Sequence, residues 1–142
     1  MTLAVLKKAL QAEGLEIYRT RENEVVLAER VRENLILDSG VRVRAGTPVE
    51  VFVVFRAERH DFPGEADTAV FDHAAELGGA AAKEGFAELA RNAVPMTDPG
   101  DPERVLDTFY EVTFRAAADD YDGAVRLARF ALGLERTATG PT

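Results

Sequence analysis

The sequence contains no cysteine and only one serine, Ser39. The lack of cysteine excludes disulfides, zinc–thiolate sites and cysteine nucleophiles. Ser39 lies in an Asp-Ser-Gly stretch without the Gly-x-Ser-x-Gly frame of hydrolase nucleophiles, so we interpret it as a hairpin-turn residue. Residues 78–85 contain three glycines and a lysine but not the spacing of a phosphate-binding loop. We therefore predict a protein that is not an enzyme, with no catalytic residue and no cofactor.

Long apolar segments are also missing. No stretch approaches the roughly 20 apolar residues that a membrane-crossing helix needs. Lys7 and Lys8 interrupt the N-terminal apolar run, and no small-residue cleavage site follows it, which argues against a signal peptide. We expect a cytoplasmic protein that does not bind a membrane.

Positively charged residues are scarce in the second part of the chain, residues 60–142. The net charge is −8. Residues 15–59 hold eight arginines and eight acids, whereas residues 60–142 hold seven bases and sixteen acids. Such a field repels phosphate backbones, so we expect no direct binding of nucleic acid. It would favour a partner with a basic surface, such as a nucleic-acid-binding protein, or it serves solubility alone.

With 142 residues, 46% hydrophobic and 30% charged, the chain suits one globular domain. Thr2 is placed to cap a first helix, and Gly14 stands where a helix end favours a left-handed residue. A last helix over 121–136 follows a cap at Asp119 or Asp120. We predict a single domain over 1–136 and a frayed tail over 137–142.

Alternating apolar residues predict strands between these helices. Short β-rich pieces cover 15–20, 24–31, 33–38 and 39–46. Residues 49–59 are apolar on both faces at their centre, which predicts a central strand, and residues 107–118 predict a half-buried antiparallel strand. Residues 65–93 are rich in alanine and helical in character, and the prolines at 95, 99 and 102 indicate a turn-rich loop. The fold class is therefore α+β, an antiparallel sheet flanked by helices on one side, summarised as α-β-β-β-α-β-α.

The glycine pair within 78–82 leaves three alternatives open. Each glycine in a helix costs about 1 kcal/mol relative to alanine. Either the helix breaks there into two, or close packing against the sheet offsets the cost, or a second copy of the helix packs there in a dimer.

Both histidines lie in one acidic stretch, residues 56–79. His60, Asp61 and His73 could in principle form a metal site. Their spacing matches neither His-x-x-x-His nor His-Glu-x-x-His, and Pro63 and Gly64 lie between the histidines. We therefore predict no metal site and interpret the stretch as an acidic strand-to-helix corner with a structural His73.

Three stretches together show a resemblance: the opening LAVLKKALQAEGLEIYRTRENEVVLAE, the strand pair VEVFVVFRAER and DTFYEVTFRAAADD, and the closing YDGAVRLARFAL. In this pattern the chain resembles the YbjN-like family and, at the level of the fold, the type III secretion chaperones. The resemblance implies a small, acidic, usually dimeric protein without catalytic residues. YbjN-like proteins are linked to stress responses, and the secretion chaperones hold a client segment along a surface of helix and strands. The proline-containing stretch 95–102 departs from the secretion chaperones.

We therefore expect a chaperone-like adaptor that forms a homodimer and binds a client protein by strand addition or in an apolar groove. Alternatively, it is a small apolar-ligand-binding protein of the helix-grip or cystatin-like type, with His73 or Tyr110 as its polar group. The candidate client or dimer surface consists of Leu3, Leu6, Leu10, Phe52, Val54, Gly78, Gly79, Ala82 and Phe109.

Overall fold

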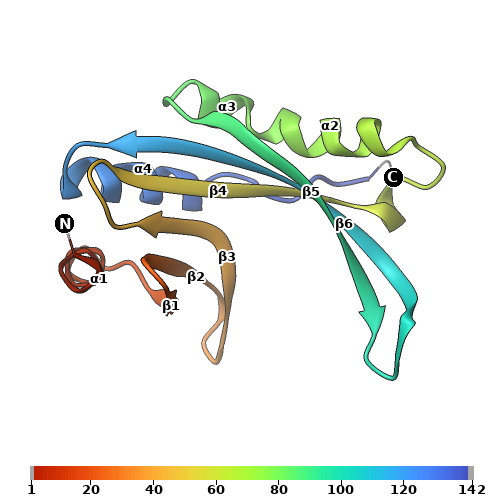
Figure 1. Ribbon diagram of the computed structural model, residues 1–142, viewed down its shortest axis with the longest axis horizontal. Coiled ribbons are helices and arrows are strands. Elements are labelled where there is room, and N and C mark those ends of the chain that lie inside the picture. Colours follow the sequence, from red (N-terminus) through yellow and green to blue (C-terminus); the bar gives the residue numbers. More distant parts are fainter. Residues whose placement is uncertain (1, 141–142) are drawn as a thin grey trace.

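A six-stranded antiparallel sheet and four α-helices make up the computed structural model, which describes residues 2–140 (Figure 1). Its strand order is β1-β2-β3-β4-β6-β5. Along the chain the elements are α1 (Leu3–Ala12), β1 (Ile17–Arg21), β2 (Glu24–Arg32), β3 (Leu35–Arg44), β4 (Val49–Glu58), the 3-10 turn η1 (Arg59–Asp61), α2 (Asp67–Leu77), α3 (Gly79–Ala82), β5 (Ala87–Asp98), β6 (Asp101–Ala118) and α4 (Tyr121–Leu132). Within the described residues, no helix is both long and apolar enough to cross a membrane. The α+β class is confirmed.

Strand β4 lies between β3 and β6, as its sequence predicted. Every second residue from Val49 to Ala57 is fully buried on one face of the sheet. This face meets apolar residues from all four helices, including Leu6, Ala74 and Ala128, in a single core. The helices therefore cover one face of the sheet and leave the other without a covering element.

The predicted helix ends at Thr2, Gly14 and Asp120 are confirmed. The Thr2 hydroxyl accepts a hydrogen bond from the Val5 amide at 3.3 Å, and the Asp120 carboxylate accepts one from the Gly123 amide at 2.8 Å. Gly14 has a φ of 82°, which ends the first helix as its position indicated. Local capping chemistry fixes these boundaries.

The helical character expected over residues 65–93 is wrong for the second half of this segment. The chain turns at Gly85, whose φ is 96°, and residues 87–98 form strand β5 along β6. Alanine-rich sequence favours a helix in isolation, but hydrogen bonding to β6 overrides this weak preference. The order is therefore α-β-β-β-β-α-α-β-β-α, with two more strands and one more helix than the summary order.

The expected proline loop is mostly strand as well. Pro95 lies in β5 opposite Thr108, and Pro102 lies in β6, so only Pro99 and Gly100 connect the two strands. Proline is tolerated in β5 because this is an edge strand of the sheet. Pairing with β4 stops at Phe109, so the hairpin beyond it leaves the body as a projecting arm, formed by residues 94–109 (Figure 1).

Strand β3 is also longer than predicted, because residues 35–44 form one strand that bends at Gly40. The prediction of Ser39 as a hairpin-turn residue is wrong. Its side chain is buried within β3, and its hydroxyl donates a hydrogen bond to the Leu27 carbonyl at 2.7 Å. Beyond the bend β3 no longer pairs with β4, which leaves one edge of β4 open from Val54 onward.

The C-terminal segment fills that edge. The Arg56 amide donates to the Arg136 carbonyl at 2.8 Å, and the Ala138 amide donates to the Arg56 carbonyl at 2.8 Å. The Arg136 guanidinium also bonds three carbonyls at the end of α4 and the Ser39 carbonyl. The expected frayed tail thus differs from the described part of that segment, which contacts β4 as far as Ala138 and packs Gly140 against Asp61 of η1. Residues 141–142 lie outside the described residues.

The glycine pair combines two of the three alternatives. The helix does break, at Gly78 between α2 and α3. Gly78 also packs closely against the sheet, because a Cβ atom there would overlap the Phe114 ring, whereas a Cβ atom at Gly79 would meet nothing within 4 Å. Gly78 is therefore required by intrachain packing and Gly79 is not.

Two substitutions test this difference. We expect Gly78→Ala to lower the free energy of unfolding by about 1–3 kcal/mol, because the added methyl group overpacks the core against Phe114. Gly79→Ala should instead be neutral or raise it by up to about 1 kcal/mol, because alanine favours the helix. Urea unfolding followed by circular dichroism measures both, and equal effects of the two substitutions would contradict this assignment.

Candidate functional site

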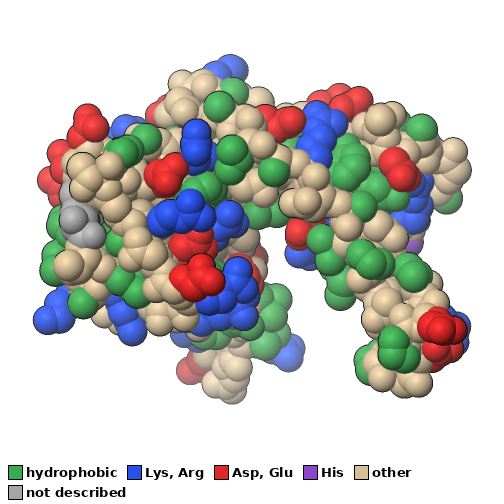
Figure 2. Space-filling model, in the orientation of Figure 1, with side chains coloured by type: hydrophobic (Ala, Val, Ile, Leu, Met, Phe, Trp, Pro, Cys, Tyr) green, Lys and Arg blue, Asp and Glu red, His purple; other side chains and the backbone are tan. Residues whose placement is uncertain are grey.

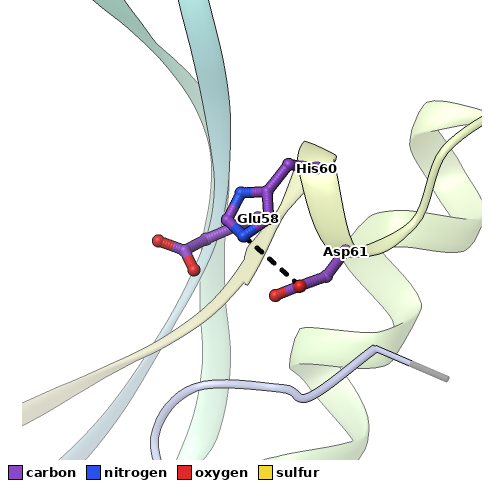
Figure 3. Close-up of side chains that lie close together, drawn as sticks. All are labelled: Glu58, His60 and Asp61. Carbon is purple, nitrogen blue, oxygen red and sulfur yellow. Dashed lines mark ion pairs between the residues drawn. The ribbon is translucent and has the colours of Figure 1, made fainter. Parts of the chain in front are cut away.

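The corner between β4 and α2 holds His60 with three carboxylates. His60 Nδ1 lies 2.6 Å from Asp107 Oδ2 on β6, and His60 Nε2 lies 3.3 Å from Asp61 Oδ1. The backbone amide of His60 also donates to Asp107 at 3.2 Å. Figure 3 shows His60 next to Asp61 and Glu58 at the end of the strand. The predicted acidic corner thus includes a contact with Asp107, which is distant in sequence.

These contacts change the pKa of both partners. The Asp107 hydrogen bond has the largest effect and raises the pKa of His60. Desolvation opposes it, and the charges of Asp61, Asp107 and Glu58 raise the pKa further. Burial raises the pKa of Asp107, but hydrogen bonds from His60 and the Thr108 amide outweigh it and lower the pKa overall. The pair favours a charged imidazolium facing a carboxylate.

The ligand atoms of Glu58, His60 and Asp61 lie within 4.8 Å of one another. One imidazole and two carboxylates form a donor set that zinc accepts, and Asp107 would orient the ring from its other nitrogen. The His60 side chain is 60% exposed, however, and ion pairs within the cluster already account for its geometry. We assign no metal to it.

His73 does not join this cluster. It lies on α2, where its ring stacks on Phe62 with centroids 4.2 Å apart, and its Nε2 lies 2.8 Å from Glu65 Oε1. The sequence allowed in principle a metal site with two histidines, His60 and His73. In the structure His73 contacts Glu65 and is not part of the cluster of Glu58, His60 and Asp61. His73 instead connects α2 to the loop before it.

Arg59, Asp67 and Tyr110 form a hydrogen-bonded network beside the corner. Arg59 Nη2 lies 2.6 Å from Asp67 Oδ1, and the Tyr110 hydroxyl donates to the same oxygen at 2.8 Å. Arg59 also donates to the carbonyls of Phe62 and Glu65, at 3.1 and 2.7 Å. The network ties the loop before α2 to strand β6, and it already uses the Tyr110 hydroxyl.

The uncovered face of the sheet is rich in arginine. The strand register places Arg19, Val26, Arg42, Phe52 and Arg115 in one row across five strands. The next row on one side adds Arg21, Glu24, Arg44 and Glu50. On the other side, the row beyond Val54 and Thr113 adds Arg56 with Glu111. We call the six arginines of these rows the arginine face: Arg19, Arg21, Arg42, Arg44, Arg56 and Arg115.

Phe52 shows how this face is built. Its side chain is 1% exposed although no helix or strand covers it. The guanidinium carbons of Arg42 and Arg44 lie 4.4 and 4.8 Å from the centroid of its ring. Cation–π stacking therefore removes Phe52 from water while the arginine charges stay on the surface.

A hollow of about 650 Å³ opens on this face. Apolar side chains in its lining include Val26, Val54, Leu37 and Leu134, and four members of the arginine face also line it. The segment Leu134–Thr137 and the bent part of β3 form its sides. Figure 2 shows an open gap between the body and the arm, but no residue of the arm lines the hollow.

The nine candidate surface residues from the sequence fall into three groups. Leu6, Leu10, Phe52 and Gly78 are buried, so they are corrected to interior positions that offer no docking surface in this structure. Leu3, Val54 and Phe109 are half-buried, and Gly79 and Ala82 are exposed. The large exposed apolar residues lie elsewhere: Val5, Tyr18, Val31, Leu37, Leu89, Val94, Met96, Val105 and Leu106. The last five all belong to β5 and β6.

The Tyr110 hydroxyl should contribute measurably to stability. We expect Tyr110→Phe to lower the free energy of unfolding by about 1 kcal/mol, because it leaves Arg59 and Asp67 without a shared partner. Tyr18→Phe is the matched control, since Tyr18 is 40% exposed and has no side-chain hydrogen bond among the described residues. Urea unfolding measures both variants. An equal loss of unfolding free energy in the two would show that the hydrogen bonds of Tyr110 do not stabilise the fold.

The contact between His60 and Asp107 predicts a pH dependence. We expect a folded-state pKa of His60 above its ordinary value of about 6.5, and a smaller rise in the Asp107→Asn variant. Because the folded pKa exceeds the unfolded one, the pair's contribution to stability is complete below the unfolded pKa. It is lost as the pH rises through the folded pKa.

An NMR titration of the His60 ring protons measures these values, with protein unfolded in urea as the reference. The corresponding fall in stability above pH 6.5 should be reduced in His60→Gln. An unchanged His60 pKa in Asp107→Asn would contradict the role given to this contact.

The sequence predicted the acidic corner but missed the arginine face. The alternation Val41-Arg42-Val43-Arg44 was visible, yet nothing in it indicated that Arg19, Arg56 and Arg115 lie on the same face of neighbouring strands. Comparisons of the chain with protein-family models, with curated proteins and with solved structures found no match.

Proposed function

We propose that this protein is a non-enzymatic, protein-binding adaptor of the chaperone-like kind, and that it forms a homodimer. The observation that supports this most is strand β5. All of its residues from Ala87 to Thr97 are exposed, and it pairs only with β6. A strand with a free edge offers unpaired backbone amides and carbonyls, with which a strand of another polypeptide can pair.

The exposed apolar side chains of β5 and of the arm fit this use. Leu89, Val94 and Met96 on β5 are 37–48% exposed, and Val105 and Leu106 on β6 are both 55% exposed. Soluble proteins seldom gather exposed apolar residues on one projecting element unless it contacts a partner. Pro95 removes one backbone donor, so strand addition would use mainly the part of β5 before it.

The alternative of a small apolar-ligand pocket has less support. Its expected polar groups are already engaged, Tyr110 with Asp67 and His73 with Glu65. The 650 Å³ hollow lies on the opposite face from the helices and is lined largely by charged side chains. It does not resemble an enclosed apolar pocket between sheet and helix.

The exposed hairpin can be tested with one variant, called the arm variant, that carries Leu89→Gln on β5 before the arm and Met96→Gln within the arm. We expect the dissociation constant of the dimer to rise at least about tenfold, because two apolar side chains lose contact area in the interface. Analytical ultracentrifugation measures this constant. Affinity capture from a native lysate, read by mass spectrometry, tests whether the same variant also loses client proteins.

The matched control carries Val5→Gln and Val31→Gln, which change equally exposed apolar residues away from the arm. It should keep both the dimer and the captured proteins. If the control loses as much as the arm variant, or if the wild-type chain is monomeric and captures nothing, the proposed function is wrong.

A further inference from the structure

The fold sorts charge in a way that the sequence does not show. On the uncovered face, the six arginines stand against only three glutamates in the same rows, Glu24, Glu50 and Glu111. These rows therefore have three more arginines than acids. The rim of the hollow on the same face adds Arg136 with Glu29, Asp38 and Glu135, so the face has an excess of one positive charge, although the whole chain has a net charge of −8. The arginines are thus concentrated on one face of a molecule that is strongly acidic elsewhere.

The glutamates do not neutralise all six arginines. Glu24 contacts Arg42 at 3.2 Å and Arg44 at 2.6 Å. Glu50 contacts Arg115 at 3.2 Å and Arg44 at 3.8 Å, so each of these two carboxylates is shared between two arginines. Within residues 2–140, Arg19 and Arg21 make no ion pair, and both are exposed. These two guanidiniums are free to bind an external carboxylate.

The shape of the face suits an extended chain. Arg19 and Arg42 lie two strands apart in one row, about 10 Å at the usual spacing of strands. An extended peptide rises about 3.3 Å per residue and its side chains alternate between two faces, so carboxylates two or four residues apart, about 7 or 13 Å, face the same way and bracket this spacing. Val26 lies between them on β2, and both Val26 and Val54 line the hollow with apolar side chains.

We propose that the arginine face binds an extended acidic segment of a partner polypeptide. This inference rests on the proposed protein-binding function and names the chemistry of the bound segment. Guanidinium groups match carboxylates with two parallel hydrogen bonds, which gives geometric as well as electrostatic selectivity.

A polypeptide fits better than a nucleic acid. Glu29, Asp38 and Glu135 lie around the hollow, and the molecule outside the face is strongly acidic. A phosphate backbone has a charge at every nucleotide and would meet this repulsion along its length. A peptide can place its few carboxylates on the arginines and neutral residues near the acids.

Binding is tested with fluorescein-labelled deca-glutamate as the probe, by fluorescence anisotropy at low and at physiological ionic strength. Deca-glutamine and oligothymidylate of ten nucleotides serve as comparison probes. We expect deca-glutamate to bind more tightly than both, and its affinity to fall as salt screens the charges. The variant Arg19→Gln with Arg21→Gln should raise its dissociation constant about tenfold, through the loss of two charge-assisted contacts.

The matched control carries Lys8→Gln and Arg126→Gln, which remove the same charge from exposed residues of α1 and α4 on the helical side. It should bind deca-glutamate nearly as well as the wild type. In the wild-type protein, NMR shift changes on adding the probe should concentrate in β1 to β4 and at the Nε–H groups of the arginine face. This second measurement does not depend on how the variants fold.

Three results would overturn the inference: equal weakening in both variants, shift changes confined to other surfaces, or tighter binding of oligothymidylate than of deca-glutamate. The test is separate from that of the arm. A protein that dimerises and captures partners through β5 but ignores deca-glutamate keeps the proposed function and loses this inference. A protein that binds deca-glutamate through Arg19 and Arg21, with no effect of the arm variant, loses the proposed role of β5 instead.

Discussion

The pairing of β4 with β6 is the interaction on which the rest of the structure depends. Ten consecutive residue pairs, from Val49 with Ala118 to Glu58 with Phe109, form without a bulge. This ladder joins the N-terminal strands to the C-terminal hairpin and places the Phe55 and Phe114 rings edge to face, with centroids 5.4 Å apart. It also determines where the arm begins, because β6 continues for eight residues before Phe109 with no partner except β5.

The same register determines what each face of the sheet can do. A shift of one residue would exchange the two faces of a strand and bring its charges into the core. With the observed register, the helices bury one face of the sheet. On the other face, the guanidinium groups of Arg42 and Arg44 stack on the ring of Phe52 and shield it from water. Because side chains and not a helix cover Phe52, the face stays accessible and charged. The burial of β4 and the exposure of the arginines therefore both follow from the same strand register.

Local signals in the sequence predicted the parts of the fold that depend on local chemistry. The caps at Thr2 and Asp120, the left-handed Gly14 and the two-sided burial of β4 were all predictable. Strand β5 was not, because its exposed residues show no alternation and its alanines favour a helix until β6 pairs with them. The contact of Asp107 with His60 was equally hidden, since it joins residues 47 positions apart. What the sequence could not provide is which strands become neighbours.

Neighbouring strands also change the meaning of net charge. Counted along the chain, residues 15–59 are neutral and residues 60–142 are acidic, which pointed to a basic partner. Counted by face, five arginines of the neutral segment gather with Arg115 of the acidic segment on one side of the sheet. Alternation with a period of two makes this possible, because every second residue of a strand faces the same way. A partner meets a face and not a segment, so the sign of the face is the quantity that selects it.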